Sequence, residues 1–175
     1  MKRIVFDIFV ILVAVGTIWY VYANYGEDIF AFLFGQQSST IYIEDLAISV
    51  SVADEPEERR QGLSGVTELG ELEGKLFVFE EEKQLGIWMK DMLMDIDILW
   101  INSDMEIVHI VEQVSPDTFP ETFSNTEPAQ FVLETNAFFV ESFKIEEGDR
   151  VTIPAGLLPD ELRKEVVDQA AEDLQ

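Results

Sequence analysis

The sequence predicts a mostly β domain of the α+β class, with one or two short helices, behind a single N-terminal hydrophobic segment. Two observations support this fold class. Short apolar runs with the two-residue periodicity of strands recur between Ile41 and Ile153. Clusters of Gly, Pro, Asn and Asp separate these runs, as is typical of turns between strands. The 175 residues suit one domain with appendages.

The apolar runs predict the elements in chain order. We expect strands at 41–43, 46–52, 75–79, 85–89, 96–101, 106–114, 129–134 and 150–153. A helix is expected after Asp54, because Pro56 suits a first helical turn and Gly62 can end a helix in a left-handed conformation. A second short helix is expected within 136–143. Residues 115–128 contain three prolines and predict a long, irregular loop.

The first 25 residues have the properties of a transmembrane helix. Ile4–Tyr25 is apolar apart from one Asp and one Asn. At ~1.5 Å per residue, about 22 helical residues reach ~33 Å, which is enough to cross a hydrocarbon core of ~30 Å. Lys2 and Arg3 precede this segment, and Glu27 and Asp28 follow it. The positive-inside rule therefore predicts a single-pass membrane protein with a cytoplasmic N-terminus and an extracytoplasmic domain.

A cleaved signal peptide is the alternative interpretation of the same residues. Val21-Tyr22-Ala23 would then provide a small-residue cleavage site, and the domain would be secreted. A short apolar patch, Ile29–Phe34, follows, and then the polar stretch Gly35–Ser39, whose composition predicts a membrane-proximal linker. The chain thus divides into an anchor or signal at 1–25, a linker at 26–40, a β-rich domain at 41–153 and a helical tail at 154–175.

The composition narrows the classes of partner. The chain carries 35 acidic and 11 basic residues, a formal net charge of −24. Such a surface repels phosphate backbones, so we expect no nucleic-acid partner. The charge fits a cationic or basic-protein partner, and it equally fits solubility in a saline environment. The chain has no cysteine and a single histidine, which argues against a zinc site. We expect no metal and no cofactor.

Five sequence blocks resemble a known family. They are Glu58-Arg59-Arg60-Gln61-Gly62-Leu63, Gly74–Phe79, Ile87–Ile98 with its Trp-Met-Lys block, Phe131–Ala137 and Gly148-Asp149-Arg150-Val151. Their order and spacing resemble family one hundred and ninety-two of the domains of unknown function, the uncharacterised ancient conserved region family. The resemblance implies a compact, barrel-like antiparallel β domain, often found behind a signal peptide or membrane segment. It implies no particular activity.

The sequence also departs from the usual pattern of that family. Members commonly have Asn where Asp91 stands, Pro where Met94 stands, Met where Ser64 stands and Gly where Phe138 stands.

Trp88 and Lys90 are the first candidate site residues. In a strand they would point to one face. A flat aromatic ring beside a long cation can bind a sugar ring or a carboxylate. The alternative is a core tryptophan covered by Lys90. We favour a core position for Trp88 and a pocket position for Lys90.

Asp95 and Asp97 share a face at i, i+2 spacing. Such a pair could bind Ca²⁺ or act as general acid and base. A salt bridge with Arg59, Arg60 or Lys90 is the more ordinary arrangement. Because basic residues are scarce, a local basic pocket within an acidic surface is the sharpest site hypothesis.

Glu134 lies at the end of a predicted strand, beside Asn136. It fits either a polar contact in a pocket or a hydrogen-bonded junction between a strand and a helix. His109 lies in mid-strand, where a packed or surface position is expected. The candidate ligand pocket comprises Arg59, Arg60, Trp88, Lys90, Asp95, Asp97 and Glu134.

These observations favour a membrane-anchored extracytoplasmic module that binds a small ligand or an envelope protein. One alternative is a hydrolase that uses Asp95, Asp97 or Glu134 with Lys90. The other is a structural component of the cell envelope that assembles through its long loop. No catalytic residue is assigned from the sequence.

Overall fold

A computed structural model of the chain describes residues 39–160 and 162–164. The expected anchor and nearly all of the linker lie outside these residues, as does the tail beyond Lys164. Among the residues that the structure describes, no helix is long and apolar enough to cross a membrane.

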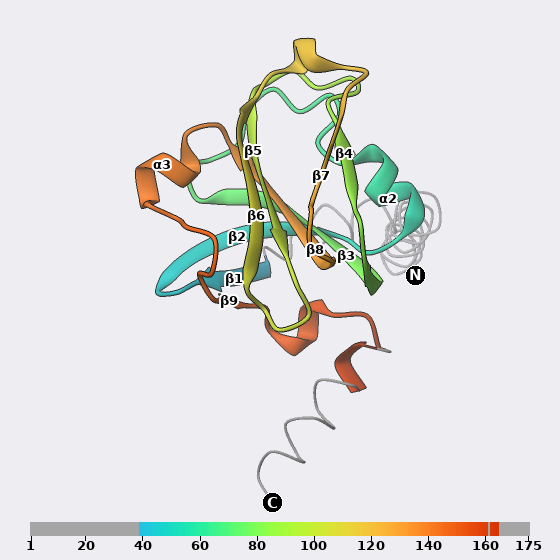
Figure 1. Cartoon of the computed structure of the whole chain (residues 1–175), viewed down its shortest axis with the longest axis vertical. Helices are drawn as coiled ribbons and strands as arrows, with labels where there is room; N and C mark the ends of the chain where they lie inside the picture. Colours follow the sequence, from blue (N-terminus) through green and yellow to red (C-terminus); the bar gives the residue numbers. More distant parts are fainter. Residues whose placement is uncertain (1–38, 161, 165–175) are drawn as a thin grey trace, which may run out of the picture. The chain divides into compact units, whose positions relative to one another are not determined.

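Seven strands form one sheet in the order β6-β5-β8-β3-β2-β1-β9 (Figure 1). Their bounds are β1 Ser39–Ile43, β2 Leu46–Ala53, β3 Glu73–Lys83, β5 Ile96–Ile101, β6 Ile107–Val114, β8 Ala129–Asn136 and β9 Val151–Thr152. A separate ribbon pairs β4, Gly86–Trp88, with β7, Thr122–Ser124. The helices α2, Pro56–Gln61, and α3, Phe139–Phe143, are short, and η1, Pro116–Thr118, and η2, Ala155–Leu157, are single 3₁₀ turns. The expected mostly β composition with few short helices is confirmed.

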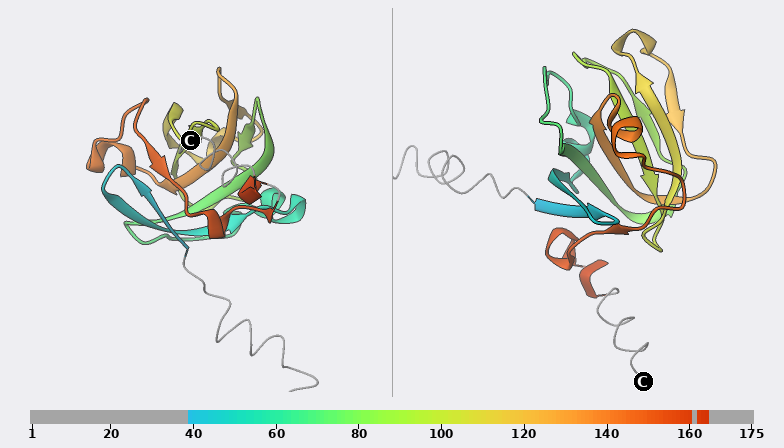
Figure 2. Two further views of the ribbon diagram at one scale, coloured as in Figure 1. Left: turned by 90° about the horizontal axis from the view of Figure 1, so that it is seen from below. Right: turned by 90° about the vertical axis from the view of Figure 1, so that its left-hand side faces the viewer.

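The sheet curls into a half-barrel, which is clearest in the left view of Figure 2. Its two edge strands meet at one end, where Glu106 forms an isolated antiparallel bridge with Arg150. The Ile107 amide donates to the Asp149 carbonyl at 3.0 Å, and the Val151 amide donates to the Met105 carbonyl at 2.8 Å. The expected barrel-like shape is therefore a half-barrel whose edges are joined near the start of β6.

One strand pair differs from the antiparallel expectation. β2 and β3 run parallel, with Val50 opposite Gly74 and Val52 opposite Leu76. Parallel neighbours need a crossover of about a dozen residues or more, and residues 54–72, which include α2, provide it. The expected helix after Asp54 is present, and Glu55 caps it through a reciprocal capping box with Glu58.

Both faces of the central strands β5 and β8 are buried. The inner face contributes apolar residues from every strand of the curl, including Ile41, Ile48, Leu76, Leu99, Ile107, Leu133 and Val151. α3 and the first part of the tail, with Leu158 and Leu162, cover this face. A second core lies on the outer face of the central strands and includes Phe77, Ile87, Met92, Ile98, Trp100 and Val132. Successive side chains of β5 and β8 therefore enter different cores.

Asp97 belongs to the inner face. It is fully buried on β5, opposite Thr135 of β8. Its Oδ1 atom accepts a hydrogen bond from the Gln113 amide at 2.8 Å, and its Oδ2 atom accepts one from the Val140 amide at 2.9 Å. Asp97 thus ties the end of β6 and the start of α3 to the centre of the sheet.

Replacing Asp97 with Ala is expected to lower the free energy of unfolding by about 2 to 4 kcal/mol, because it leaves two amides without their acceptor. Urea denaturation followed by tryptophan fluorescence measures the change. Asp95→Ala is the matched control, since the exposed Asp95 side chain should contribute less than about 0.5 kcal/mol. Equal effects of the two substitutions would contradict this role for Asp97.

Candidate functional site

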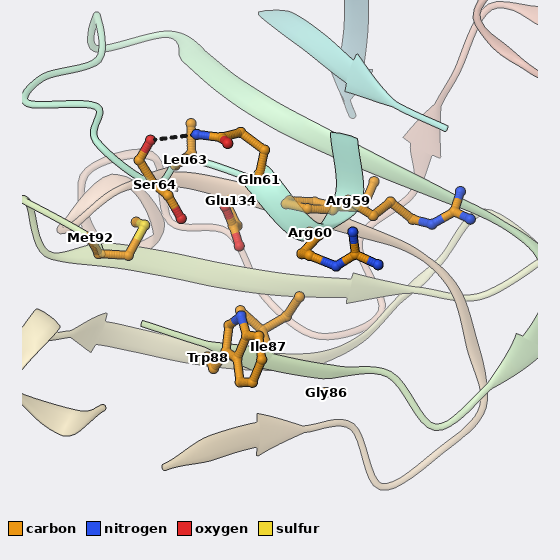
Figure 3. A pocket seen from close by; sticks show the side chains of 12 residues that line it. Arg59, Arg60, Gln61, Leu63, Ser64, Gly86, Ile87, Trp88, Met92 and Glu134 are labelled. Atoms are coloured by element: carbon orange, nitrogen blue, oxygen red, sulfur yellow. Dashed lines mark hydrogen bonds between the residues drawn. The ribbon is translucent and has the colours of Figure 1, made fainter. Parts of the chain in front are cut away.

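A cavity of about 50 Å³ lies on the outer face of the sheet, between α2, the loop that follows it, β4 and the end of β8 (Figure 3). Because one water needs about 10 to 15 Å³ of such space, the cavity has room for about three or four non-hydrogen atoms. Its lining residues are Arg59, Arg60, Gln61, Gly62, Leu63, Ser64, Phe77, Gly86, Ile87, Trp88, Met92 and Glu134.

The local sequence brings α2 close to the sheet at this point. Gly62 ends the helix with φ +51°, a conformation that favours glycine. A Cβ atom added there would lie 3.2 Å from the Phe77 ring and 3.9 Å from Glu134 Oε2. The Ser64 hydroxyl donates to the Lys90 carbonyl, and the Gly65 amide donates to the Asp91 carbonyl, each at 2.9 Å. These bonds hold the loop after α2 against the segment after β4.

Glu134 forms the floor of the cavity. Only 4% of the residue is exposed, and its Oε2 atom has no hydrogen-bond partner among the described residues. In Figure 3 its carboxyl group points into the middle of the lining side chains. Burial raises the pKa of Glu134 from its ordinary value of 4.5 to about 8, although the neighbouring Lys75 of β3 favours the charged form. The carboxyl group is therefore mostly protonated at neutral pH.

The two arginines of α2 have different positions. Arg59 is half-buried, donates from Nη1 to the Val78 carbonyl at 2.9 Å, and lies 5.1 Å from the centre of the Phe79 ring. Its side chain fastens α2 to β3. Arg60 is mostly exposed and forms an ion pair with Glu57 on the helix surface. Both guanidinium groups lie to one side of the Glu134 carboxyl in Figure 3.

Trp88 is at the surface, so the expected core position is wrong. The residue is 48% exposed at the end of β4, and its ring meets Phe119 edge to face at 6.2 Å between centroids. Lys90 Nζ lies 6.0 Å from the centre of the Trp88 ring. Lys90 is not among the residues that line the cavity. Trp88 and Phe119 instead form an exposed aromatic lip beside the cavity.

The structure separates the two aspartates from this site. Asp97 points to the inner face, whereas Glu134 is opposite Lys75 and Ile98 and faces outward. Asp95 is exposed before β5 begins. Among the described residues, neither aspartate pairs with Arg59, Arg60 or Lys90. The expected seven-residue pocket therefore reduces to Arg59, Arg60, Trp88 and Glu134.

His109 also lies outside the cavity. Within residues 39–160 and 162–164, no group of three or more His, Asp and Glu side chains could hold a metal ion. His109 packs 5.3 Å from the Trp100 ring and has Nδ1 3.2 Å from Glu147 Oε1. It is a packed strand histidine, as one of the expected alternatives stated.

Sequence reasoning missed Phe77, Met92 and Phe119 as site residues. Phe77 and Met92 look like ordinary core residues, and only the position of α2 makes them walls of a cavity. Phe119 lies in the proline-rich stretch expected to be an irregular loop. Its contact with Trp88 follows from the β4–β7 pairing, in which Trp88 is opposite Thr122.

Glu134 makes stability depend on pH in a defined direction. Between pH 4.5 and about 8 the unfolded chain releases the Glu134 proton while the folded chain retains it. The folded state then binds more protons, so the unfolding free energy falls by up to ~1.4 kcal/mol per pH unit. Denaturation of Glu134→Gln should lack this component across the same range. A constant difference between the wild type and Glu134→Gln from pH 5 to 9 would contradict the raised pKa.

Two solved bacterial structures share the fold. The alignment with a "putative transcription regulator" from Sinorhizobium meliloti has 30% identity and a TM-score of 0.62, and covers 68% of this chain and 92% of that one. The alignment with a protein of unknown function from Novosphingobium aromaticivorans has 23% identity and a TM-score of 0.61, and covers 64% and 82%. No curated protein matches the chain. The DUF192 family model, described as Uncharacterized ACR, matches residues 39–153, and the chain belongs to this family.

Proposed function

We propose that the domain is a binding module that receives a small polar group of its ligand in the cavity above Glu134. The observation that carries the proposal is the buried Oε2 atom, which has no hydrogen-bond partner among the described residues. A buried polar group without a partner costs about 1 to 3 kcal/mol. A ligand that pairs with Glu134 would recover this free energy, so the cavity favours binding.

The surroundings of the cavity support the same function. Trp88 and Phe119 are 48% and 45% exposed, although both have large apolar rings. Exposed aromatic side chains that lie together beside a cavity are typical of a contact surface for a ligand or partner. In the proposed complex, the polar group of the ligand enters the cavity and the rest of the ligand lies against this aromatic lip.

The proposed location is the outer side of a membrane. It rests on the first 25 residues of the sequence, which combine an apolar segment of spanning length with Lys2 and Arg3 before it and acidic residues after it. A membrane-anchored module of this kind would present its cavity to small molecules or envelope proteins outside the cytoplasm. Secretion after cleavage of a signal peptide is the competing outcome.

The raised pKa of Glu134, about 8, favours one further candidate function. A carboxyl group that stays protonated at neutral pH can act as a general acid. A hydrolase would also need a nucleophile or a second carboxylate, and no other acidic residue lines the described cavity. Asp97 is not available, because both of its oxygens accept backbone hydrogen bonds on the opposite face. We therefore place binding ahead of hydrolysis.

Regulation of transcription, suggested by the description of the Sinorhizobium meliloti protein, does not suit this chain. A net charge of −24 repels the phosphate backbone of DNA.

A screen of small neutral, cationic and anionic compounds against the full chain tests the binding function. Ligand-observed NMR should find saturable binding without turnover. Trp88→Ala should weaken the hits by about tenfold, because it removes an aromatic contact of about 1 kcal/mol or more. Leu93→Ala is the matched control, since Leu93 is 60% exposed and does not line the cavity. Failure of all three classes of compound to bind would refute the proposal.

Labelling with a reagent that cannot cross membranes tests the location. In intact cells the lysines of the acidic domain should react, and mass spectrometry of the membrane fraction should find an uncleaved N-terminus. Labelling that requires permeabilised cells would contradict the proposed orientation. A mature chain that begins at Asn24 would instead show a cleaved signal peptide.

A further inference from the structure

Building on the proposed function, we propose that the cavity above Glu134 binds the carboxylate group of a small monocarboxylic acid, to which the Glu134 carboxyl group donates its O–H. The ligand carboxylate would enter beside α2, and an apolar tail would extend over Trp88 and Phe119.

The local charge around the cavity supports an anionic ligand. The chain has 35 acidic and 11 basic residues, yet the described lining contains two arginines and a single acidic residue, Glu134. Lys75 of β3 lies opposite Glu134 in the sheet. Arg59 and Arg60 line the cavity, whereas Lys75 acts on Glu134 without lining it. The two arginines, of which Arg60 also pairs with Glu57, would favour a ligand carboxylate over a cationic group.

The hydrogen-bonding capacity of Glu134 points to the same class of ligand. A protonated carboxyl group is a donor, and its Oε2 atom has no partner among the described residues. A hydrogen bond from a neutral donor to a charged acceptor is stronger than one between two neutral groups. A cationic ligand would instead favour the ionised form of Glu134 and would be repelled by Arg59 and Arg60.

The shape of the site limits the size of the ligand. The cavity of about 50 Å³ admits a carboxylate with at most about one carbon atom behind it. Beyond the opening lie the exposed rings of Trp88 and Phe119, which offer an apolar surface. The site therefore fits a short monocarboxylate with an apolar tail.

Binding should depend on pH in a way that identifies Glu134. The charged groups that surround it are Lys75 from β3 and Arg59 and Arg60 from α2, whereas β4 and the adjoining position of β5, Ile98, contribute no titratable side chain. Affinity should be nearly constant between about pH 6 and 7.5. Above pH 8 it should fall by up to about tenfold per unit, because Glu134 loses its donor proton and repels the ligand.

The experiment compares butyrate, butylammonium and butyramide, three probes of similar size and different charge, by NMR titration of the full chain at pH 6.5 and 9.5. At pH 6.5 butyrate should bind with a dissociation constant on the order of millimolar, and at least about tenfold more tightly than the other two probes. At pH 9.5 the affinity for butyrate should be at least about tenfold lower.

Two substitutions of Glu134 test whether binding needs the hydrogen-bond donor at this position. Glu134→Gln keeps an N–H donor at every pH, so it should bind butyrate about equally at pH 6.5 and 9.5. Glu134→Leu removes the donor and should abolish binding. Arg60→Gln should weaken binding several-fold, whereas Lys144→Gln, at the end of α3 and outside the lining, is the charge-matched control and should change nothing.

The possible results separate this inference from the proposed function. Preferential binding of butylammonium, or butyrate binding that is the same in Glu134→Leu, would overturn the carboxylate assignment and leave a binding module for another class of ligand. Absence of binding by all three probes, with no hit in the wider screen, would overturn both proposals.

Discussion

Burial of the central strands β5 and β8 on both faces is the constraint on which the rest of this structure depends. Every residue of β5 is buried, and so is every residue of β8 except its last. A polar side chain on either strand must therefore find its partners inside the protein or remain without them. Asp97 and Glu134 are two carboxylates on neighbouring strands that meet this constraint in opposite ways. Asp97 accepts two backbone hydrogen bonds, whereas Glu134 has an oxygen without a partner in the described chain.

Most of the elements could be predicted from the sequence because their signals are local. The continuous apolar run at 96–101 predicted a strand covered on both faces, and all six residues are buried. Gly62 was expected to end α2, and it does so with a φ of +51°. Asp91 and Phe138 have positive φ values, +57° and +69°, a conformation that Asn and Gly adopt more readily than most residues. Strand partners were harder to predict, since β2 and β3 pair in parallel across a crossover.

The site was only partly predictable, because its geometry also depends on which strands pair. Residue types identified Arg59, Arg60 and Glu134 as candidates, but spacing along the chain cannot show which face of a buried strand a carboxylate occupies relative to another strand. The register does so, because it places Asp97 opposite Thr135 and Glu134 opposite Ile98. The exposure of Trp88 had a similar origin. β4 pairs with β7 at the margin of the fold and not with β3, which leaves the Trp88 ring at the surface.

The floor of the cavity and its aromatic lip tolerate substitution to different extents. A substitution in β8 disturbs one of two packed cores, so the floor of the cavity is tightly constrained. The lip consists of exposed side chains on a short ribbon and a turn, Trp88 and Phe119, whose replacement leaves both cores intact. In the proposed binding function, substitutions at the lip would change the accepted ligand without disturbing either core, while the Glu134 carboxyl group stays at the floor of the cavity.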